Sequence, residues 1–591
     1  MHSSGLRIGL QARNRAQQAL NQPPHQPPRN GWCAGHSPYG ESRTRTGDTT
    51  IFSRVLYQLS YLAAKGIVSA GRRRASVACP AMRKLSLLTL IFGIFAIAGC
   101  GGSGGGSDGS SPLDNALRYL PADSPFAVAI DTDTKGDQFE AAGDLSDKFP
   151  FGDDVQKQLE EALGERAGNF KDLQKALGNE FVVGSTDVRS FVDSPGDDDT
   201  AFVGAIQVDD NDALDKLIDG EKAEEDGEAD GAKLYKDDSG DSFAIDGDVL
   251  VVAGSKQELE DALATRNGDD GMTESDFDAG TEGVSQEALL RVYLNVGELL
   301  KADPDAKQAL KSKWVAAVRT AGIALTFEPQ EVAVDIDVTT DPSGLTDADL
   351  PIAAGADAPQ VLDRGGINLA LRNPSQLLEF AQATAGTIDP EGFASFEQDK
   401  AKIERELKID LDEDLIDQLD GDLAVSIGLD GKFGARAELK DPAAFEQSLT
   451  KLEQVLPNIA EGATGEKVGF VKPKDGEDFY AIATASGDQI VFGVVKDVFV
   501  LSNSAAIAGS LAGDGTKAVS GAKGALVLNM NAEQIAKAAL EQVDSTDIDF
   551  GNQIEKLQKG KLDTGPLNEL IGSFEATTDG LSGSFTVTID N

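Results

Sequence analysis

A series of sequence blocks occurs twice in this 591-residue chain, in the same order. Each series begins with a turn-rich segment that leads into a strand, followed by the end of a helix with the strand after it. A strand that runs into an Asp-capped helix comes next, then two more blocks of a strand and a helix, and each series closes with a hairpin. The matched blocks are 119–133 with 361–375, 176–187 with 418–430, 200–218 with 431–449, 247–263 with 496–511, 291–301 with 526–537, and 321–341 with 571–590. Because supersecondary units repeated in a fixed order indicate an internal repeat, the sequence predicts two tandem duplicated repeats.

The spacing between matched blocks drifts along the chain, as insertions in surface loops would cause. It is 249 residues between Asp248 and Asp497, and 234 residues between Asn295 and Asn529. A stretch at 341–359, rich in Asp, Pro and Gly, separates the two series, and such stretches are typical of domain boundaries. We therefore place α+β repeat 1 at 113–350 and α+β repeat 2 at 351–591.

The strands of each repeat show a period of two. Phe126, Val128 and Ile130 alternate with Ala127 and Ala129, and such alternation predicts a sheet with one buried face and one wetter face. Short polar turns connect neighbouring strands as hairpins. The sequence thus predicts an α+β fold, in which each repeat is a mainly antiparallel sheet with helices on one face.

A short export signal precedes the repeats. Met82 is followed by two basic residues and then by fifteen mostly apolar residues at 85–99. This length suits a signal peptide and is short for a membrane-spanning helix. The run ends in Ile97, Ala98, Gly99 and Cys100, which resembles the lipobox of bacterial lipoproteins. The resemblance implies that the signal peptidase recognises Ile97, Ala98 and Gly99, and that Cys100 is linked to a diacylglycerol and becomes the first mature residue.

The residues after this signal favour the lipoprotein interpretation. The Gly/Ser-rich stretch at 100–112 predicts a flexible tether between a membrane and a folded body. The alternative is that 82–99 forms a single membrane-spanning helix that ends in an ordinary cysteine. Acyl chains on Cys100, at about 0.8 kcal/mol per buried CH₂ group, would hold the protein at the outer face of the bacterial cytoplasmic membrane.

Residues 1–81 differ in composition from the rest of the chain. They hold 11 of the 53 Lys and Arg residues, only two of the 99 acidic residues, and all three histidines. Because a signal peptide is read at the N-terminus, we expect 1–81 to be a mis-called, disordered N-terminal extension, with Met82 as the true start. The alternative is a basic nucleic-acid-binding arm, which does not suit an exported chain.

Composition excludes several classes of site in the mature chain. Beyond residue 99 there are 40 basic and 97 acidic residues, no histidine, and Cys100 as the one cysteine. Zinc sites with Cys and His ligands, His-ligated haem, disulfides and Ser-His-Asp triads are therefore excluded within one chain. The excess of negative charge disfavours nucleic acid as a partner. We predict no catalytic residue, no metal site and no cofactor.

The block order resembles a known family. The lipobox, the tether, the opening at 119–133 and the stretch at 148–163 are similar to those of bacterial lipoproteins classed as a domain of unknown function, DUF3352. The resemblance covers residues 82–591. It implies an extracytoplasmic location and this architecture, but it brings no activity and no functional residues.

Three acidic stretches are candidates for cation binding. Residues 131–142 share part of the spacing of an EF-hand loop, but Lys135 and Ala142 replace two of its ligands, so we interpret the stretch as a strand end and turn. At 408–422 the aliphatic spacing is helical and places the carboxylates on a solvated face. At 194–201 a charged loop offers only loose cation binding.

Trp314 is one of two tryptophans in the chain. It lies in a stretch predicted to be helical, and we expect it in the core rather than in a sugar-binding site. The same stretch carries a basic cluster, which either contacts the membrane or the other repeat, or balances local charge. The cluster consists of Lys307, Lys311, Lys313 and Arg319.

These features predict a non-enzymatic binding or envelope-structural protein, with the membrane and an unknown small ligand or envelope protein as partners. A ligand site is expected between the repeats. One alternative, a carrier of an apolar ligand, requires an apolar-lined cavity of at least about 300 Å³. A carboxylate-dependent extracytoplasmic hydrolase requires two buried carboxyl groups about 5–10 Å apart in a cleft. An adhesin or assembly partner would expose an apolar patch of several hundred Å².

Overall fold

The computed structural model describes most of the chain after the predicted tether. The described residues are 111–133, 135–149, 175–176, 179–188, 202–221, 223–236, 242–268, 270–452, 468–471, 479–484, 489–513, 515–543 and 564–590. Helices and antiparallel strands are mixed along these residues, so the α+β class predicted from the sequence is confirmed.

The strands of the first half run from β1 to β10. They are β1 (Phe126–Ile130), β2 (Phe181–Ser185), β3 (Phe202–Gln207), β4 (Glu224–Ala229), β5 (Ala232–Lys236), β6 (Ser242–Asp246), β7 (Val249–Ala253), β8 (Leu290–Leu294), β9 (Val318–Glu328) and β10 (Glu331–Thr340). The helix α4 (Pro112–Leu117) precedes β1. Between the strands lie the helices α5 (Asp137–Asp147), α9 (Asn211–Glu221), α10 (Lys256–Asn267), α11 (Glu274–Gly280), α12 (Val296–Ala302) and α13 (Lys313–Ala317).

The second half contributes the remaining strands and helices. Its strands are β11 (Val361–Leu362), β12 (Ile367–Arg372), β13 (Asp422–Ile427), β14 (Phe433–Glu438), β15 (Val468–Val471), β16 (Tyr480–Thr484), β17 (Gln489–Val495), β18 (Val498–Ser502), β19 (Thr516–Lys517), β20 (Leu526–Asn531), β21 (Leu567–Thr577) and β22 (Gly580–Ile589). Its helices are α14 (Pro374–Ile388), α15 (Pro390–Leu407), α16 (Pro442–Leu452), α18 (Ala505–Leu511) and α19 (Ala532–Val543).

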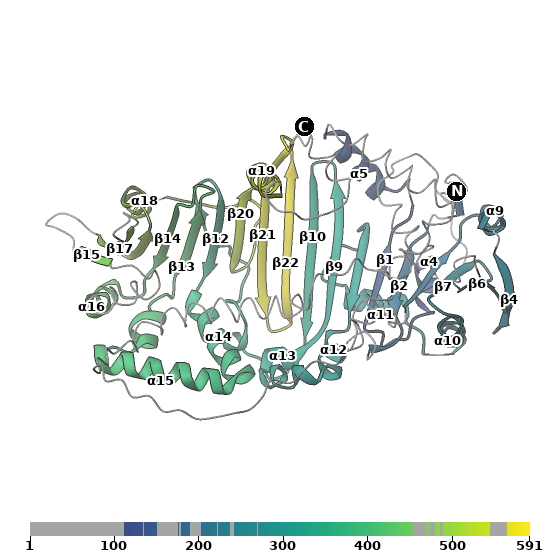
Figure 1. The fold of residues 1–591 in the computed structure, drawn as a ribbon, viewed down its shortest axis with the longest axis horizontal. Coiled ribbons are helices and arrows are strands. Elements are labelled where there is room, and N and C mark those ends of the chain that lie inside the picture. The colour runs from purple at the N-terminus through teal and green to yellow at the C-terminus, as the bar shows by residue number, and fades with distance from the viewer. Residues whose placement is uncertain are drawn as a thin grey trace, which may run out of the picture. The chain divides into compact units, whose positions relative to one another are not determined.

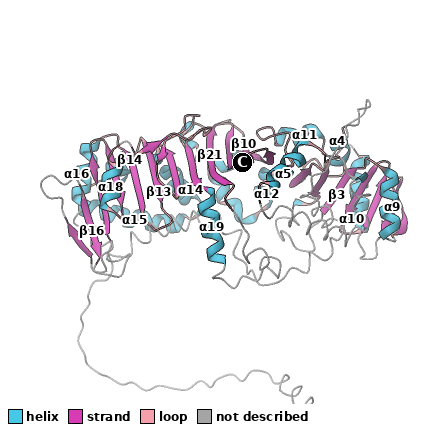
Figure 2. Cartoon of the chain, turned by 90° about the horizontal axis from the view of Figure 1, so that it is seen from above, coloured by secondary structure: helices cyan, strands magenta, loops and turns pink. Residues whose placement is uncertain are grey.

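Twenty of these strands form one antiparallel sheet. The pairings give the order β4-β5-β6-β7-β3-β2-β1-β8-β9-β10-β22-β21-β20-β12-β13-β14-β18-β17-β16-β15. Figure 1 shows β10 and β22 side by side where the two halves meet. In Figure 2, β21, β13 and β14 lie on one side of β10 and β3 lies on the other, in agreement with this order.

The two halves of the sheet have the same strand order when each is followed from its outer edge to the centre. The register of the hairpins also agrees. Glu331 pairs with Glu328 between β10 and β9, and Gly580 pairs with Thr577 between β22 and β21. Adding 249 to the residue numbers of the first pair therefore gives the second pair. The stacked pair of Tyr235 and Phe243 in the first half corresponds to the stacked pair of Tyr480 and Phe492 in the second, with ring centroids 5.2 and 5.6 Å apart.

The pairing of β10 with β22 is symmetric about its centre. Asp335 pairs with Ser584, which is its counterpart at the same shift of 249 residues. On either side, Glu331 pairs with Thr588 and Thr339 pairs with Gly580. Glu331 thus meets the counterpart of Thr339, and Thr339 meets the counterpart of Glu331. Such reciprocal pairing is typical of an isologous interface about a two-fold axis. The halves are thus joined as two copies in a symmetric dimer would be.

One sequence match needs correction. Asn295 accepts a hydrogen bond from the backbone N–H of Glu298 at 3.3 Å and caps α12. The residue in the same position before α19 is Asn531, which accepts from the N–H of Gln534 at 2.7 Å. Asn529, the match expected from the sequence, lies within β20 and pairs with Asn368. The alignment was wrong by two residues because both asparagines lie in the same run, Asn-Met-Asn, and only the cap geometry distinguishes them.

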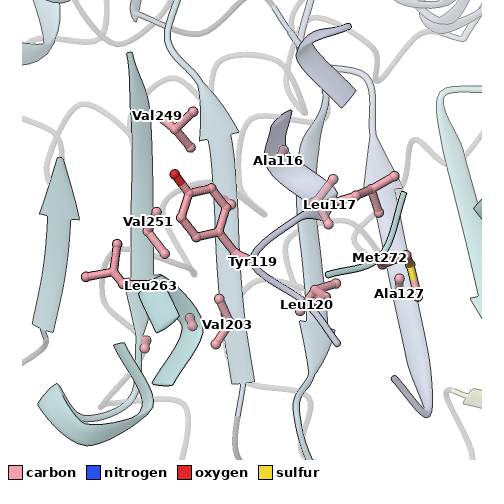
Figure 3. Packing of buried hydrophobic residues seen from close by; sticks show 14 of the residues in the cluster. Ala116, Leu117, Tyr119, Leu120, Ala127, Val203, Val249, Val251, Leu263 and Met272 are labelled. Atoms are coloured by element: carbon pink, nitrogen blue, oxygen red, sulfur yellow. The ribbon is translucent and has the colours of Figure 1, made fainter. Parts of the chain in front are cut away.

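The largest buried cluster of the first half lies on the side of the sheet covered by α4, α10 and α11. Figure 3 shows Tyr119, Leu117 and Leu120 against strands that carry Val203, Val251 and Ala127. Tyr119 is fully buried, and its hydroxyl donates to Asp246 at 2.9 Å. Burial raises the pKa of Tyr119 above its ordinary value, with the Asp246 carboxylate as the second cause, so the side chain stays a neutral donor.

Candidate functional site

The strand β8 buries one side more deeply than the other. Arg291 and Tyr293 are each 7% exposed, on the side that α11 covers. Arg291 lies 5.1 Å from the centre of the Phe277 ring of that helix and forms an ion pair with Asp278 at 3.0 Å. The other residues of the strand are only half-buried: Leu290, Val292 and Leu294. A charged side chain is therefore covered here, while its aliphatic neighbours remain partly exposed.

The corresponding strand of the second half, β20, repeats this pattern. Val527 and Asn529 are 0% and 3% exposed. Asn529 donates a hydrogen bond to Glu569 at 2.5 Å. The half-buried residues between them are again aliphatic or sulfur-containing: Leu526, Leu528 and Met530. Both halves thus leave the apolar side of their strands less covered than the side that holds the polar residues.

The four central strands β9, β10, β22 and β21 continue this apolar side. Their register places sixteen residues on it, and every one is apolar or glycine. The twelve large ones are all half-buried: Ile323, Leu325, Phe327, Val332, Val334, Ile336, Val338, Leu581, Phe585, Val587, Leu570 and Phe574. The small ones are Ala321, Gly572, Ala576 and Gly583. We call the surface formed by these sixteen residues the apolar face.

The opposite side of the same four strands is mostly polar, with Ala324, Ala333 and Ile571 among its few apolar side chains. It carries Asp335 and Asp337 of β10 and Ser584 of β22. The chain passes close over Asp337, because a Cβ atom on Gly283 would lie 2.1 Å from the Asp337 carboxyl carbon. Burial raises the pKa of Asp337, and the neighbouring Glu282 adds to this. Surfaces of soluble proteins usually keep polar groups in water and cover apolar ones, so the apolar face is the feature that needs a functional explanation.

Two aromatic rings lie side by side on the part of the apolar face that β21 and β22 form. Phe574 and Phe585 meet edge to face, with their centroids 5.3 Å apart at an angle of 77°. Each ring lies over a glycine of the neighbouring strand: a Cβ on Gly583 would be 2.4 Å from Phe574, and one on Gly572 would be 2.9 Å from Phe585. The glycines therefore let both rings lie close against the backbone of the neighbouring strand.

One end of the apolar face is covered by the segment that links the halves. Leu350 and Ile352 pack in a buried cluster with Ala576, and Phe574 and Trp314 pack partly against it. The Trp314 ring also meets Phe380 edge to face at 6.2 Å, so the expected packing role of this tryptophan is observed. The stretch 341–359 thus covers one end of the apolar face. Its role as a domain boundary stays a prediction.

Two open cavities in the described part of the chain have charged linings. One, of about 700 Å³, lies beside α15 and is lined by Asp399, Lys402, Glu404 and Arg405 among others. The second, of about 600 Å³, lies at the turn between β9 and β10. Neither has the apolar lining that an enclosed carrier needs.

The carboxyl groups at the end of β1 support a turn. Asp131 accepts the backbone N–H of Asp133 at 2.8 Å, and Asp133 accepts that of Lys135 at 3.0 Å. Such bonds from Asp side chains to the backbone two residues on are typical of Asx turns. Within the described residues, no group of three or more His, Cys, Asp or Glu side chains could hold a metal ion. The structure thus agrees with a strand end and turn over the first part of 131–142, whereas Asp137 begins the helix α5, so 137–142 is helical and that part of the prediction was wrong.

Asp131 predicts a measurable pH dependence. Burial raises its pKa from 3.8 to about 6, so the folded chain holds this proton over a range in which the unfolded chain has lost it. Its contribution to stability is full below about pH 4 and is lost as the pH rises through 6. We expect Asp131→Asn, which keeps an acceptor for the turn, to gain stability relative to the wild type between pH 4 and pH 7. Urea unfolding midpoints at pH 4, 5.5 and 7 would test this, and a constant difference between the two proteins would contradict it.

The acidic stretch 408–422 is only in part a helix. A single π-helical turn, Asp412–Ile416, replaces the expected longer helix. Leu411, Leu415 and Leu419 pack against the cluster that contains α16, so the aliphatic spacing correctly indicated a buried side. Asp412 forms an ion pair with Lys400, which is 9% exposed. This ion pair joins the π-helical turn to the helix α15.

The basic cluster near Trp314 takes part in local ion pairs. Lys313 lies 2.9 Å from Asp349, and Arg319 lies 2.9 Å from Asp341. Both partners belong to the linking segment that follows β10. These contacts agree with the local charge balance that was one of the two interpretations of the cluster.

The predicted anchor lies outside the described residues. This applies to Cys100, to the peptidase recognition residues Ile97, Ala98 and Gly99, and to the charged loop at 194–201. None of the helices in the described part of the chain is long and apolar enough to span a membrane. The sequence motifs indicate these residues but not the apolar face, although the alternation of Val332, Val334, Ile336 and Val338 with other residues is visible in the sequence.

Comparison with known proteins gives one family. A family model described as "Protein of unknown function (DUF3352)" matches residues 85–460. No curated protein matches the chain. Two solved structures of TP0453, crystal forms III and IV, are 8% and 9% identical, with TM-scores of 0.23. They cover 39% and 38% of this chain and 82% and 80% of their own, and a similarity this low carries no argument.

Proposed function

Because the chain belongs to the DUF3352 family, whose description names no activity, we propose a function from the geometry of the molecule. The protein is a non-enzymatic, lipid-anchored protein of the bacterial cell envelope that binds an apolar ligand on the apolar face. The observation that carries this proposal is that all twelve large side chains of that face are half-buried, while Arg291 and Asn529 on the opposite side of the sheet are buried.

The free energy available on the apolar face supports binding. Complete burial of a Val, Leu or Phe side chain contributes about 1.5–3 kcal/mol. Covering the exposed part of a half-buried side chain contributes a fraction of this, roughly 0.5 kcal/mol. Twelve such side chains give about 6 kcal/mol before the cost of association. Any neighbouring strands that the ligand also covers would add to this.

The anchor places such a protein beside a membrane. The lipobox resemblance assigns Cys100 as the acylated residue, and the stretch 100–112 follows it as a Gly/Ser-rich tether. A flexible chain of this length has an end-to-end distance of about 20 Å. The folded body would therefore stay close enough to the outer face of the cytoplasmic membrane to exchange apolar molecules with it.

The proposal includes the duplication of the body. The shared strand order and the shared hairpin registers of the two halves support two repeats at 113–350 and 351–591. The symmetric pairing of β10 with β22 supports one continuous binding surface instead of two separate ones. The site expected between the repeats is then a shared sheet face.

Mass spectrometry of the protein purified from its native membrane tests this function. We expect a first peptide that begins at a diacylated or triacylated Cys100, no peptides from residues 1–81, and an apolar molecule that is released on denaturation. Peptides from 1–81 would overturn the assigned start. A protein that carries no apolar molecule and takes up no apolar dye would overturn the binding function.

A further inference from the structure

We propose that the apolar face, together with the apolar residues of the neighbouring strands out to β1 and β12, binds the acyl chains of diacyl membrane lipids, several chains at a time. This inference rests on the proposed function and names its ligand. It commits to the hydrocarbon chains as the bound part and leaves the head group outside the apolar face.

The chemistry of the apolar face matches hydrocarbon. None of its sixteen residues has a side chain that donates or accepts a hydrogen bond. The backbone groups of the central strands are occupied by the ladders that join β9, β10, β22 and β21. A peptide or a sugar placed here would lose its hydrogen bonds to water without replacement, which is costly. An acyl chain has none to lose.

The same composition continues beyond the central strands. By register, β8 adds Leu290, Val292 and Leu294 on one side. On the other side, β20 adds Leu526, Leu528 and Met530 in the corresponding positions. Protein–protein interfaces carry about one hydrogen bond per 100–200 Å² and a polar rim. An apolar surface over this many strands, covered at one end by the linking segment, fits a ligand without polar groups better than it fits a folded partner.

Charge argues against a second copy of the chain as the occupant. The chain has a formal net charge of −46, so two copies repel each other as they approach. A diacyl lipid that is zwitterionic experiences no such repulsion. The exposed carboxylates around the sheet therefore disfavour self-association more than lipid binding.

The dimensions allow more than one chain. From β1 to β12 the sheet crosses eight strands, which span about 34 Å at 4.8 Å per strand. The hydrocarbon core of a bilayer is about 30 Å thick and two acyl chains deep, so one chain is about 15 Å long. The eight strands therefore offer two areas, one on each side of the pair formed by Asp335 and Ser584, and each is long enough for the chains of one lipid. The linking segment covers one end of the area in the second half.

The test uses the purified full-length protein and phosphatidylcholine that carries a pyrene-labelled acyl chain, offered in vesicles. Transfer of the lipid to the protein is followed by the rise in pyrene monomer fluorescence. Val334→Glu introduces a charge at the centre of the apolar face, and the matched control Ala333→Glu introduces it on the other side of the same strand. We expect Val334→Glu to weaken lipid binding at least about tenfold, because an unpaired charge must be desolvated beneath the chains, and Ala333→Glu to change it less than about twofold.

A second pair of variants, on β22, distinguishes a loss of lipid binding from a folding defect caused by a charge in β10. Val587→Glu and Thr586→Glu place the same charge on opposite sides of β22, and far-UV circular dichroism reports whether each variant is folded. Equal effects of the apolar-face and opposite-face variants on lipid binding would overturn the proposed site. Folded wild-type protein that takes up no labelled phosphatidylcholine would overturn the proposed ligand.

Two further probes separate this inference from the proposed function. If pyrene-labelled fatty acid binds and phosphatidylcholine does not, the diacyl lipid is wrong while apolar binding stands. If only anilinonaphthalene sulfonate binds, and binds less to Val334→Glu, the acyl-chain ligand is wrong and the apolar face is still a binding site. If no probe binds the folded wild type, both the inference and the binding function are overturned.

Discussion

Replacement of Cys100 by serine is expected to move the protein from the membrane fraction to the soluble fraction. A serine hydroxyl cannot form the thioether that holds the diacylglycerol, and the acyl chains, at about 0.8 kcal/mol per buried CH₂ group, supply the affinity of the anchor. The loss of two or three chains therefore changes membrane binding by many orders of magnitude. Fractionation of cells that produce the tagged wild type and Cys100→Ser, followed by immunoblotting, would measure the shift.

The chain provides a matched control for this experiment. Cys79 precedes the assigned start at Met82, so Cys79→Ser should leave the membrane fraction unchanged. Wild-type and Cys100→Ser proteins that fractionate alike, with the unprocessed signal absent from both, would show that the lipobox resemblance does not reflect an anchor. A mature protein that keeps 82–99 would instead support the alternative of a membrane-spanning helix.

The sequence predicts which residues share a side of a strand more reliably than it predicts which side is covered. The alternation in β1 correctly separates Phe126 and Val128 from Ala127 and Ala129. In the structure, the two alanines are 0% and 3% exposed within the main cluster, while Phe126 and Val128 are half-buried. Periodicity depends on the geometry of one strand, whereas coverage depends on which helices return to which side, and α4, α10 and α11 return to the side of the small residues.

The apolar face could not be assembled from the sequence because it depends on distant pairings. The stretches 331–338 and 580–587 each show the alternation of a half-buried strand. Their pairing in one register, with Val334 opposite Phe585, joins residues about 250 positions apart. The closing hairpins of the two halves were matched as blocks, but a match between blocks says only that they are expected to have the same local structure. It does not say that they meet.

Substitution of Gly366 by alanine is expected to destabilise the second half of the chain by about 2–4 kcal/mol. Gly366 has a φ of +100°, which residues with a side chain rarely adopt. An added Cβ would also lie 2.3 Å from the carbonyl oxygen of Ile427 and 2.9 Å from the Cα of Gly428. Both neighbours are backbone atoms, so a side-chain rotation cannot relieve the contact, and β12 must move away from β13.

Gly365 gives the matched comparison for this prediction. A Cβ on Gly365 meets no atom within 4 Å, so Gly365→Ala should change the free energy of unfolding by less than about 1 kcal/mol, and restriction of the unfolded chain favours a small gain. Urea unfolding followed by circular dichroism would compare the two variants with the wild type. Equal midpoints for Gly366→Ala and Gly365→Ala would contradict the close approach of β13 to the start of β12. Because Ile367 begins β12, the outermost strand of the proposed lipid-binding surface in the second half, a displaced β12 should also lower the uptake of labelled lipid, and only Gly366→Ala should show both losses.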